Sequence, residues 1–487
     1  MRHSRRLPAF LLAASLAALP AAGCVRNPAT GERQFSLFSE AQEIQMGREY
    51  DAQIVASLGL YPDSALQRYV QELGTRLAAR SERPHLPWTF RVLDDPVVNA
   101  FALPGGYIYV TRGILAYLDS EAELASVLGH EIGHVTARHS VSRMSTQQLA
   151  QLGLAIGVLV RPELETAASI ASAGLSVLFL KHSRDDERQA DDLGLRYMRR
   201  ASYDPREMAD VFAMLERVSA AEGGGRVPEW LSTHPDPGDR RARISAQVAA
   251  LPPDSVTGRV EHESFLRRLD GLVFGQNPRE GFFRGAEFLH PDLAFRFAFP
   301  AGWKTSNQKS AVLAVSPAED AVVQITLAEE ATPEAAARRF FAGQEMTGTP
   351  RHDRINGLDA VGGPFSTTTE SGPVRGVAAF IAHGGRVYDV VAYAVAARWP
   401  AYDEAARRAI RSFGRLTDPE ALAVQPLRLD IVTLERAMTL EEFARRHPGP
   451  ASLEDLARLN QAEPATRFAR GELLKRVTGA LPPGASE

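Results

Sequence analysis

The sequence predicts an α+β protein of several domains: a mainly helical domain with a small sheet, an α/β domain, and a small strand–helix–helix–strand module. Its 487 residues exceed one ordinary hydrophobic core and favour roughly two to four domains. Helical patterns dominate the early part of the chain, and strand-like alternation begins near residue 293. We place the domains at residues 24–275, 278–418 and 425–480, after a signal segment at residues 1–23.

The first domain is expected to begin with two helices followed by a strand. Residues 36–60 are predicted to be helical, with Ser39 as N-cap, and residues 67–80 form the second helix. A turn at Pro-Gly-Gly then precedes β-branched and aromatic residues that favour a strand. The predicted strand residues are Tyr107, Ile108, Tyr109 and Val110.

A third helix is expected around the run His130-Glu131-Ile132-Gly133-His134. Ser120 is a suitable N-cap, and Glu123 three residues later would complete a capping box. Apolar residues follow at helical spacing. They are Leu124, Val127, Leu128, Ile132 and Val135.

This run has the pattern H-E-x-x-H, which is typical of zinc hydrolases when it lies on a helix. Two histidines four residues apart lie about 40° apart around the axis, so His130 and His134 can hold one metal ion. Glu131 points about 100° away from His130, close enough to take a proton from a water that the ion activates. The alternative is a chance match on a helix with solvated histidines.

A catalytic zinc needs a third protein ligand. The metzincin pattern fails here, because Ser140 stands where its third histidine would be and His139 is one residue away. A later helix offers Glu187 and Asp191, four residues apart on one face. Glu187 can bind the metal while Asp191 accepts the outer N–H of a ligand histidine. The alternative is an ordinary solvated acidic helix.

Three segments resemble the HExxH zinc metallopeptidases of the HtpX, BepA and CAAX-prenyl-protease type. They are residues 99–113, the H-E-x-x-H helix, and the later segment with Arg184, Glu187 and Asp191, together spanning roughly residues 36–250. The resemblance implies a zincin-type fold with one zinc ion per chain. It also implies that His130, His134 and Glu187 bind the zinc and that Glu131 is the general base.

The resemblance extends to two further elements. Ser232-Thr233-His234-Pro235 matches a loop whose histidine can reach the zinc, so His234 is either a fourth ligand that plugs the site or a turn histidine before Pro235. In zincins the strand beside the active-site helix lies at the sheet edge. We therefore expect an extended peptide substrate along Tyr107–Val110, the alternative being a core strand.

The N-terminus is typical of an exported lipoprotein. Arg2, Arg5 and Arg6 precede an apolar stretch, and small residues precede Cys24, the only cysteine. We expect cleavage before Cys24, lipidation of Cys24, and a periplasmic location on a membrane, with the outer membrane favoured because Val25 is not aspartate. The chain has 55 basic and 59 acidic residues and no basic patch with interleaved aromatic residues, which excludes a nucleic-acid partner.

An apolar tract at residues 152–180 lies between the two ligand helices. It is interrupted by Arg161, Glu163 and Glu165, and each apolar run is shorter than the ~20 residues of a membrane span. A buried helical hairpin and a segment that dips into lipid both remain open.

The last two regions carry no cluster of catalytic residues. In the α/β domain, Leu293, Phe295, Phe297 and Phe299 alternate, so they should face a core. Residues 429–475 resemble a LysM module, which implies a peptidoglycan partner. Ala437-Met438 replaces the usual Gly-Asp of that module.

These observations predict a zinc-dependent endopeptidase of the bacterial cell envelope that cleaves misfolded or misassembled envelope proteins. The alternative is an envelope chaperone, scaffold or peptidoglycan-binding protein whose zinc site is plugged or structural. An intact Glu131 favours the enzyme, because a structural site needs no base.

Overall fold

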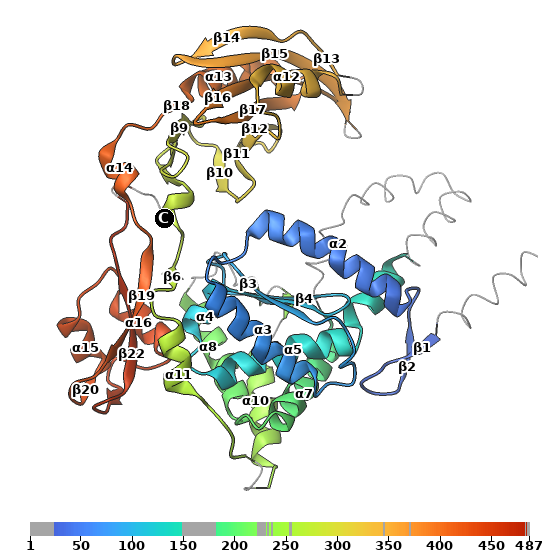
Figure 1. Ribbon diagram of the computed structural model, residues 1–487, viewed down its shortest axis with the longest axis vertical. Coiled ribbons are helices and arrows are strands. Elements are labelled where there is room, and N and C mark those ends of the chain that lie inside the picture. The colour runs from blue at the N-terminus through green and yellow to red at the C-terminus, as the bar shows by residue number, and fades with distance from the viewer. Residues whose placement is uncertain are drawn as a thin grey trace, which may run out of the picture.

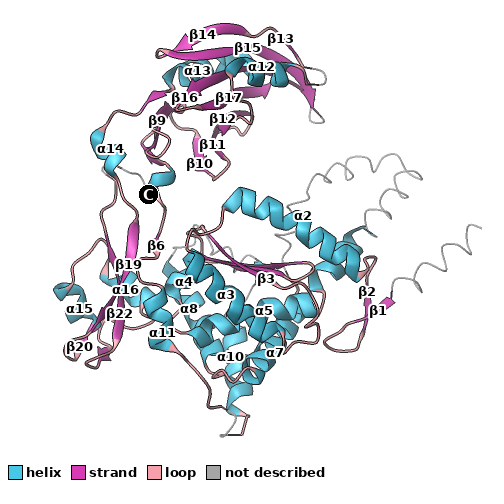
Figure 2. Ribbon diagram, in the orientation of Figure 1, coloured by secondary structure: helices cyan, strands magenta, loops and turns pink. Residues whose placement is uncertain are grey.

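The computed structural model shows an α+β protein with three bodies (Figures 1 and 2). Helices dominate the lower body, strands form most of the upper body, and the C-terminal module lies beside the lower body. The structure describes residues 24–148, 182–221, 230, 233–234, 237–252, 256–343, 346–369, 372–482 and 484. The predicted signal segment at residues 1–23 and the apolar tract at residues 152–180 therefore lie outside the described residues.

The lower body combines helices with a three-stranded sheet. Its helices are α2 (Glu40–Leu58), α3 (Ser64–Ala78), α4 (Arg112–Tyr117), α5 (Glu121–Thr136), α7 (Arg184–Arg200), α8 (Glu207–Ala221), α10 (Pro237–Ala249) and α11 (His262–Arg268). Its sheet contains β3 (Thr89–Leu93), β4 (Ala100–Leu103) and β5 (Tyr107–Thr111). A short hairpin of β1 (Cys24–Arg26) and β2 (Arg33–Phe35) precedes them. No helix among these described residues is long and apolar enough to cross a membrane.

The strand predicted at Tyr107–Val110 exists, but its expected place at the sheet edge is wrong. β5 pairs with β3 on one side and with β4 on the other, so it is the central strand. Tyr107 and Tyr109 pack toward α2, whereas Ile108 and Val110 join the core beneath the sheet. The Pro-Gly-Gly turn does not start the sheet, because it joins β4 to β5 as a hairpin. β4 is therefore an edge strand.

The helix caps follow the sequence with one difference. Ser39 forms a full capping box with Gln42 at the start of α2. At α5, the Ser120 side chain accepts from Glu123 N–H as predicted. The return bond goes elsewhere, because the Glu123 carboxylate accepts from Asp119 N–H rather than from Ser120 N–H. The Ser120 hydroxyl instead donates to Glu207 of α8, which ties the start of the active-site helix to its neighbour.

The upper body has two sheets and its own cores. Its strands are β7 (Phe282–Arg284), β8 (Glu287–His290), β9 (Phe295–Ala298), β10 (Lys304–Asn307), β11 (Ala311–Val315), β12 (Ala321–Leu327), β13 (Thr347–Gly348), β14 (Arg351–Ile355), β15 (Leu358–Thr369), β16 (Gly372–His383), β17 (Arg386–Val395) and β18 (Gly414–Arg415). Its helical elements are the 3-10 turn η3 (Pro278–Glu280), α12 (Pro333–Phe341), α13 (Trp399–Ser412) and α14 (Pro419–Ala423). Phe295, Phe297 and Phe299 are buried, as the alternation predicts.

The C-terminal module contains the predicted strand, two helices and strand, together with two short strands, β20 (Met438–Thr439) and β21 (Arg467–Phe468), that were not predicted. Its other elements are β19 (Leu427–Thr433), α15 (Leu440–Arg446), α16 (Leu453–Leu459) and β22 (Leu473–Thr478). A third strand, β6 (Val273–Phe274), joins its sheet beside β19. The fully buried Lys475 donates to the carbonyls of Ala116 and Leu118 and pairs with Asp119 at 2.7 Å. The module is thus fastened to the lower body just before α5.

Candidate metal centre

The centre forms where α5 and α7 pack closely. A Cβ added to Gly194 would lie 2.9 Å from the backbone nitrogen of His130, and one added to Gly133 would lie 2.9 Å from the Ala190 carbonyl. Real Cβ atoms do not approach so closely, so glycine is needed at both positions. This close approach brings the histidines of α5 to Glu187 of α7. The sequence contains these glycines, but it does not show which helices they bring together.

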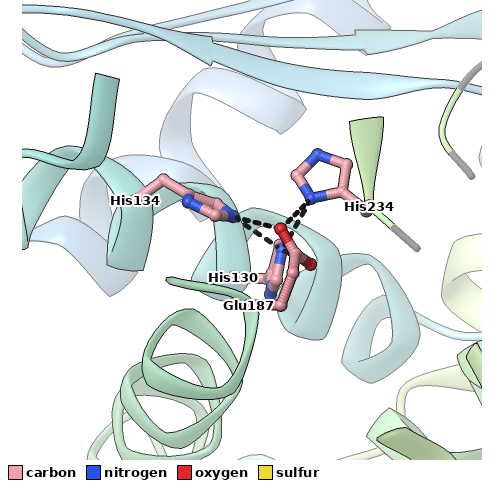
Figure 3. A group of neighbouring side chains, drawn as sticks. All are labelled: His130, His134, Glu187 and His234. Carbon is pink, nitrogen blue, oxygen red and sulfur yellow. Dashed lines mark hydrogen bonds and ion pairs between the residues drawn. The ribbon is translucent and has the colours of Figure 1, made fainter. Parts of the chain in front are cut away.

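Four buried side chains meet at one point: His130, His134, Glu187 and His234 (Figure 3). The Nε2 atom of His130 lies 3.0 Å from His134 Nε2 and 3.3 Å from His234 Nδ1. The Glu187 Oε1 atom lies 2.9 Å from His234 Nδ1 and 3.4 Å from His134 Nε2. Ligands held about 2.0–2.2 Å from a tetrahedral zinc ion lie roughly 3.3–3.6 Å apart. The distances of 2.9–3.4 Å found here are close to that spacing, and three imidazoles with one carboxylate are ligand types that zinc takes, so this donor set fits zinc.

Glu131 is beside the four donors but is not one of them. Its Oε1 atom lies 3.7 Å from His234 Nε2 and accepts no hydrogen bond from the residues that the structure describes. Burial raises the pKa of Glu131. A buried carboxylate oxygen without a donor indicates a position meant for a polar group that arrives with metal or substrate.

Burial and nearby charge keep two of the donors, Glu187 and His134, in metal-binding form. Burial alone would raise the pKa of Glu187, but His234 and Arg240 lower it well below its usual range. Arg240 Nη1 lies 2.8 Å from Glu187 Oε2. Burial lowers the pKa of His134 well below its usual value, so its ring is neutral. A carboxylate and neutral imidazoles are the forms that bind a metal.

Asp191 supports His130 from behind. Its Oδ1 atom lies 3.0 Å from His130 Nδ1, which leaves Nε2 of that ring facing the centre. Burial opposes ionisation of Asp191, but Arg240 and His130 lower its pKa to about 2. The guanidinium of Arg240 lies 2.6 Å from the same carboxylate. No local sequence pattern predicts this role of Arg240, because α10 and α7 are distant in the chain.

His134 is held by other residues, which were not predicted from the sequence. Its Nδ1 atom lies 2.8 Å from Nδ1 of His139, whose Nε2 lies 2.8 Å from Gln189 Oε1. Burial lowers the pKa of His139. The His182 ring lies beside His134, with centroids 3.9 Å apart and the ring planes tilted by 36°. Five histidines therefore meet at or beside this centre, and only His139 lies near the H-E-x-x-H run in the sequence, where it could have signalled this role.

A small cavity lies between the centre and the edge strand β4. Phe101 and Ala102 of β4 line it together with His234, and Tyr50 of α2 covers one side. Its volume is about 20 Å³, which is room for about one water molecule and not for a peptide. The central strand β5 does not line this cavity. The described residues thus place β4, rather than Tyr107–Val110, next to the centre.

Comparison with known proteins agrees with this geometry. The family model described as Peptidase family M48 matches residues 64–248. The Beta-barrel assembly-enhancing protease of Escherichia coli (strain K12) is 33% identical over 223 residues, covering 44% of this chain and 45% of that protein. The chain thus spans about half the length of that relative.

Two mitochondrial proteins are also similar to this chain. The Mitochondrial metalloendopeptidase OMA1 of Arabidopsis thaliana is 39% identical over 178 residues, covering 36% of this chain and 34% of that protein. Its namesake in Schizosaccharomyces pombe is 31% identical over 245 residues, covering 49% of this chain and 70% of that protein. With a matching family model and a relative covered over most of its length, the chain belongs to peptidase family M48.

Proposed function

We propose that this protein is a zinc-dependent endopeptidase of the bacterial cell envelope with a zincin-type active site. One observation carries the proposal: four buried donors converge on one point beside Glu131, whose buried Oε1 accepts no hydrogen bond from the described residues. His130, His134 and Glu187 would hold one zinc ion. When bound, zinc would polarise the scissile carbonyl and lower the pKa of an attacking water.

The residues around the centre then carry out the proton transfers and hold the metal ligands in position. Glu131 takes the proton of the attacking water, and burial raises its pKa toward the range of an effective base. Asp191 holds the Nδ1 side of His130, and Arg240 pairs with both Glu187 and Asp191. Protonated Glu131 can afterwards pass its proton to the leaving amine.

We propose that the peptide substrate binds along the edge strand β4. An edge strand has unpaired N–H and C=O groups, and an extended peptide can add to it through backbone hydrogen bonds. β4 borders the cavity at His234, so a peptide paired with it would pass the centre. This assignment replaces Tyr107–Val110, both of whose edges are already paired.

We propose that His234 is a plug. Its Nδ1 atom takes the fourth position, where a catalytic zinc site keeps room for water or substrate. The His234 ring stacks on Trp230 with centroids 4.8 Å apart, which holds the plug in place. A peptide can reach the centre only after this histidine withdraws.

Replacing His234 by alanine is therefore expected to raise cleavage. If the open form is about 0.1–10% populated, removal of the plug increases the rate by roughly 10- to 1,000-fold. Zinc should stay bound, because three protein ligands remain. Initial rates of casein cleavage and zinc content are measured together, with the exposed His262→Ala as control. An unchanged rate in His234→Ala would exclude gating by this residue.

The N-terminus and the relatives support a proposal for the location and the substrates of the protein. We propose lipidation at Cys24 and a periplasmic position on a membrane, the outer membrane being favoured. Misfolded or misassembled envelope proteins are the proposed substrates, in keeping with a relative named for β-barrel assembly. We also propose that the LysM-like module contacts peptidoglycan. The strand–helix–helix–strand order supports that fold.

The proposal is tested by zinc content and casein cleavage on protein that starts just after Cys24. About one zinc per chain with cleavage establishes the peptidase. Stoichiometric zinc without cleavage, in the wild type and in His234→Ala alike, would instead support a scaffold with a structural zinc. The observation that favours this second function is that His234 occupies the fourth position of the site, which a catalytic zinc keeps open.

A further inference from the structure

The N-terminal hairpin (residues 24–35) contacts the residues that hold the ligand His134 in place. Asn27 Nδ2 donates to the Ala137 carbonyl and to Gln189 Oε1, both at 3.2 Å. Gln34 Nε2 donates to the Arg138 carbonyl at 3.3 Å. These contacts fall on the two residues that precede His139 in the chain and on Gln189, the hydrogen-bond partner of His139. The hairpin thus lies against the segment that supports His134.

We propose that Asn27, Gln189 and His139 form a directional hydrogen-bond relay that sets the tautomer of His134, so that its Nε2 lone pair faces the metal. This inference rests on the proposed zinc site. Asn27, Gln189 and His139 are then positioning residues, and the N-terminal hairpin contributes to the orientation of a metal ligand.

The direction of the relay starts at Asn27. Its Oδ1 atom accepts the backbone N–H groups of Ala29 at 2.9 Å and Thr30 at 3.3 Å. Those donors can face only the oxygen of the amide, so the NH₂ group must point the other way. It donates to Gln189, and the atom that Gln189 presents must therefore be its oxygen.

The next steps follow from the chemistry of imidazole. Gln189 Oε1 can only accept, so Nε2 of His139 must carry a hydrogen. A neutral ring carries a single N–H, so Nδ1 of His139 is an acceptor. His134 Nδ1, 2.8 Å away, must then be the donor, and the other nitrogen of His134 has its lone pair free. Asp186, 3.7 Å from His139 Nε2, favours the same direction.

The relay differs from the support of His130. That ring donates to Asp191, a carboxylate that accepts at either oxygen and needs no orientation. The amide of Gln189 has one accepting and one donating end, so its orientation must be fixed by a neighbour. Asn27 fixes the orientation of this amide. Although Asn27 belongs to a hairpin far away in the sequence, it is therefore buried beside the metal centre, with only 6% of its surface exposed.

The test compares variants of Asn27 and Gln189 in the full chain. Asn27→Asp keeps the size but presents only acceptors to Gln189, which forces the amide to turn and reverses the relay. We expect His134 of the metal-free protein to change from the Nδ1–H to the Nε2–H tautomer, read by ¹⁵N NMR of labelled histidine. Zinc affinity, measured by chelator competition, should fall by about 10- to 100-fold.

Gln189 supplies the control that separates the relay from mere packing. Gln189→Leu should weaken zinc binding as Asn27→Asp does, whereas Gln189→Glu should retain it, because a carboxylate accepts in any orientation. Asn27→Ala leaves the Gln189 amide without a residue that orients it, so this change should weaken zinc binding in the otherwise wild-type chain. It should have little effect in the Gln189→Glu chain, because a carboxylate needs no orientation. A general loss of structure would lower the affinity in both.

The outcomes are distinguishable from failure of the proposed function. If the wild type binds no zinc, the proposed peptidase site itself is wrong. If the wild type binds zinc but Asn27→Asp and Gln189→Leu bind it equally well with an unchanged His134 tautomer, only the relay is overturned.

Discussion

Glu131→Gln is expected to abolish measurable cleavage while zinc remains bound. Proton transfer by a positioned side chain contributes about 10²- to 10⁴-fold to the rate, and a carboxamide cannot accept the proton. The four donors of the centre are other residues, so zinc content should stay at the wild-type value. Casein cleavage and zinc content are measured on the same preparation, in the His234→Ala chain if the plug silences the wild type.

The same substitution has an opposite expected effect on stability. Burial raises the pKa of Glu131, so in the metal-free protein the ionised carboxylate opposes folding above that pKa. A neutral amide removes this cost, and thermal unfolding of metal-free Glu131→Gln should occur at or above the wild-type temperature. The matched control is Glu263→Gln on exposed α11, which should keep full cleavage. Residual cleavage at the wild-type level in Glu131→Gln would remove Glu131 from the mechanism.

Local patterns in the sequence were enough to predict the residues that gather at the centre. Helical spacing places His130 and His134 on one face of α5, and a second helix presents Glu187 and Asp191 on one face. These are relations between residues three or four apart, which the helix geometry itself determines. The family resemblance added His234, which the structure brings within 3.3 Å of His130.

Relations between distant segments could not be predicted in the same way. Whether Tyr107–Val110 is an edge or a central strand depends on pairing with Thr89–Leu93, and a single strand's side-chain pattern does not name its partners. The roles of Arg240 and Gln189 also depend on helices that meet only in the folded chain. The position of Asn27 beside Gln189, 162 residues away, has no local sequence signal.

Glu43 was also missed, because it looks like one of several acids on the solvated side of α2. In the structure it is fully buried. Its carboxylate accepts two bonds from Arg83, at 2.9 and 3.0 Å, and one from Arg138 Nε at 3.1 Å. Arg83 also donates to the Val135 carbonyl near the end of α5. This network fastens α2, which covers the cavity with Tyr50, to the helix that carries the H-E-x-x-H run.

Glu43→Ala is therefore expected to lower the free energy of unfolding by about 3–5 kcal/mol, because it leaves buried guanidinium groups without their carboxylate. Chemical denaturation of the full chain measures the loss. The matched control is Glu49→Ala, an exposed position on the same helix, which should change stability by no more than about 0.5 kcal/mol.

A double-mutant cycle with Arg83→Met tests whether the effect belongs to the pair. Removing both charges leaves fewer unpaired groups than removing one, so the double variant should be more stable than the two single losses together imply. The expected coupling lies within about 0.5–3 kcal/mol. Strict additivity would show that Glu43 acts through its contacts with Arg138 and the β4–β5 turn, where the Gly105 N–H donates to it at 3.4 Å. In either case the loss should weaken the cover over the cavity, since α2 holds Tyr50 there.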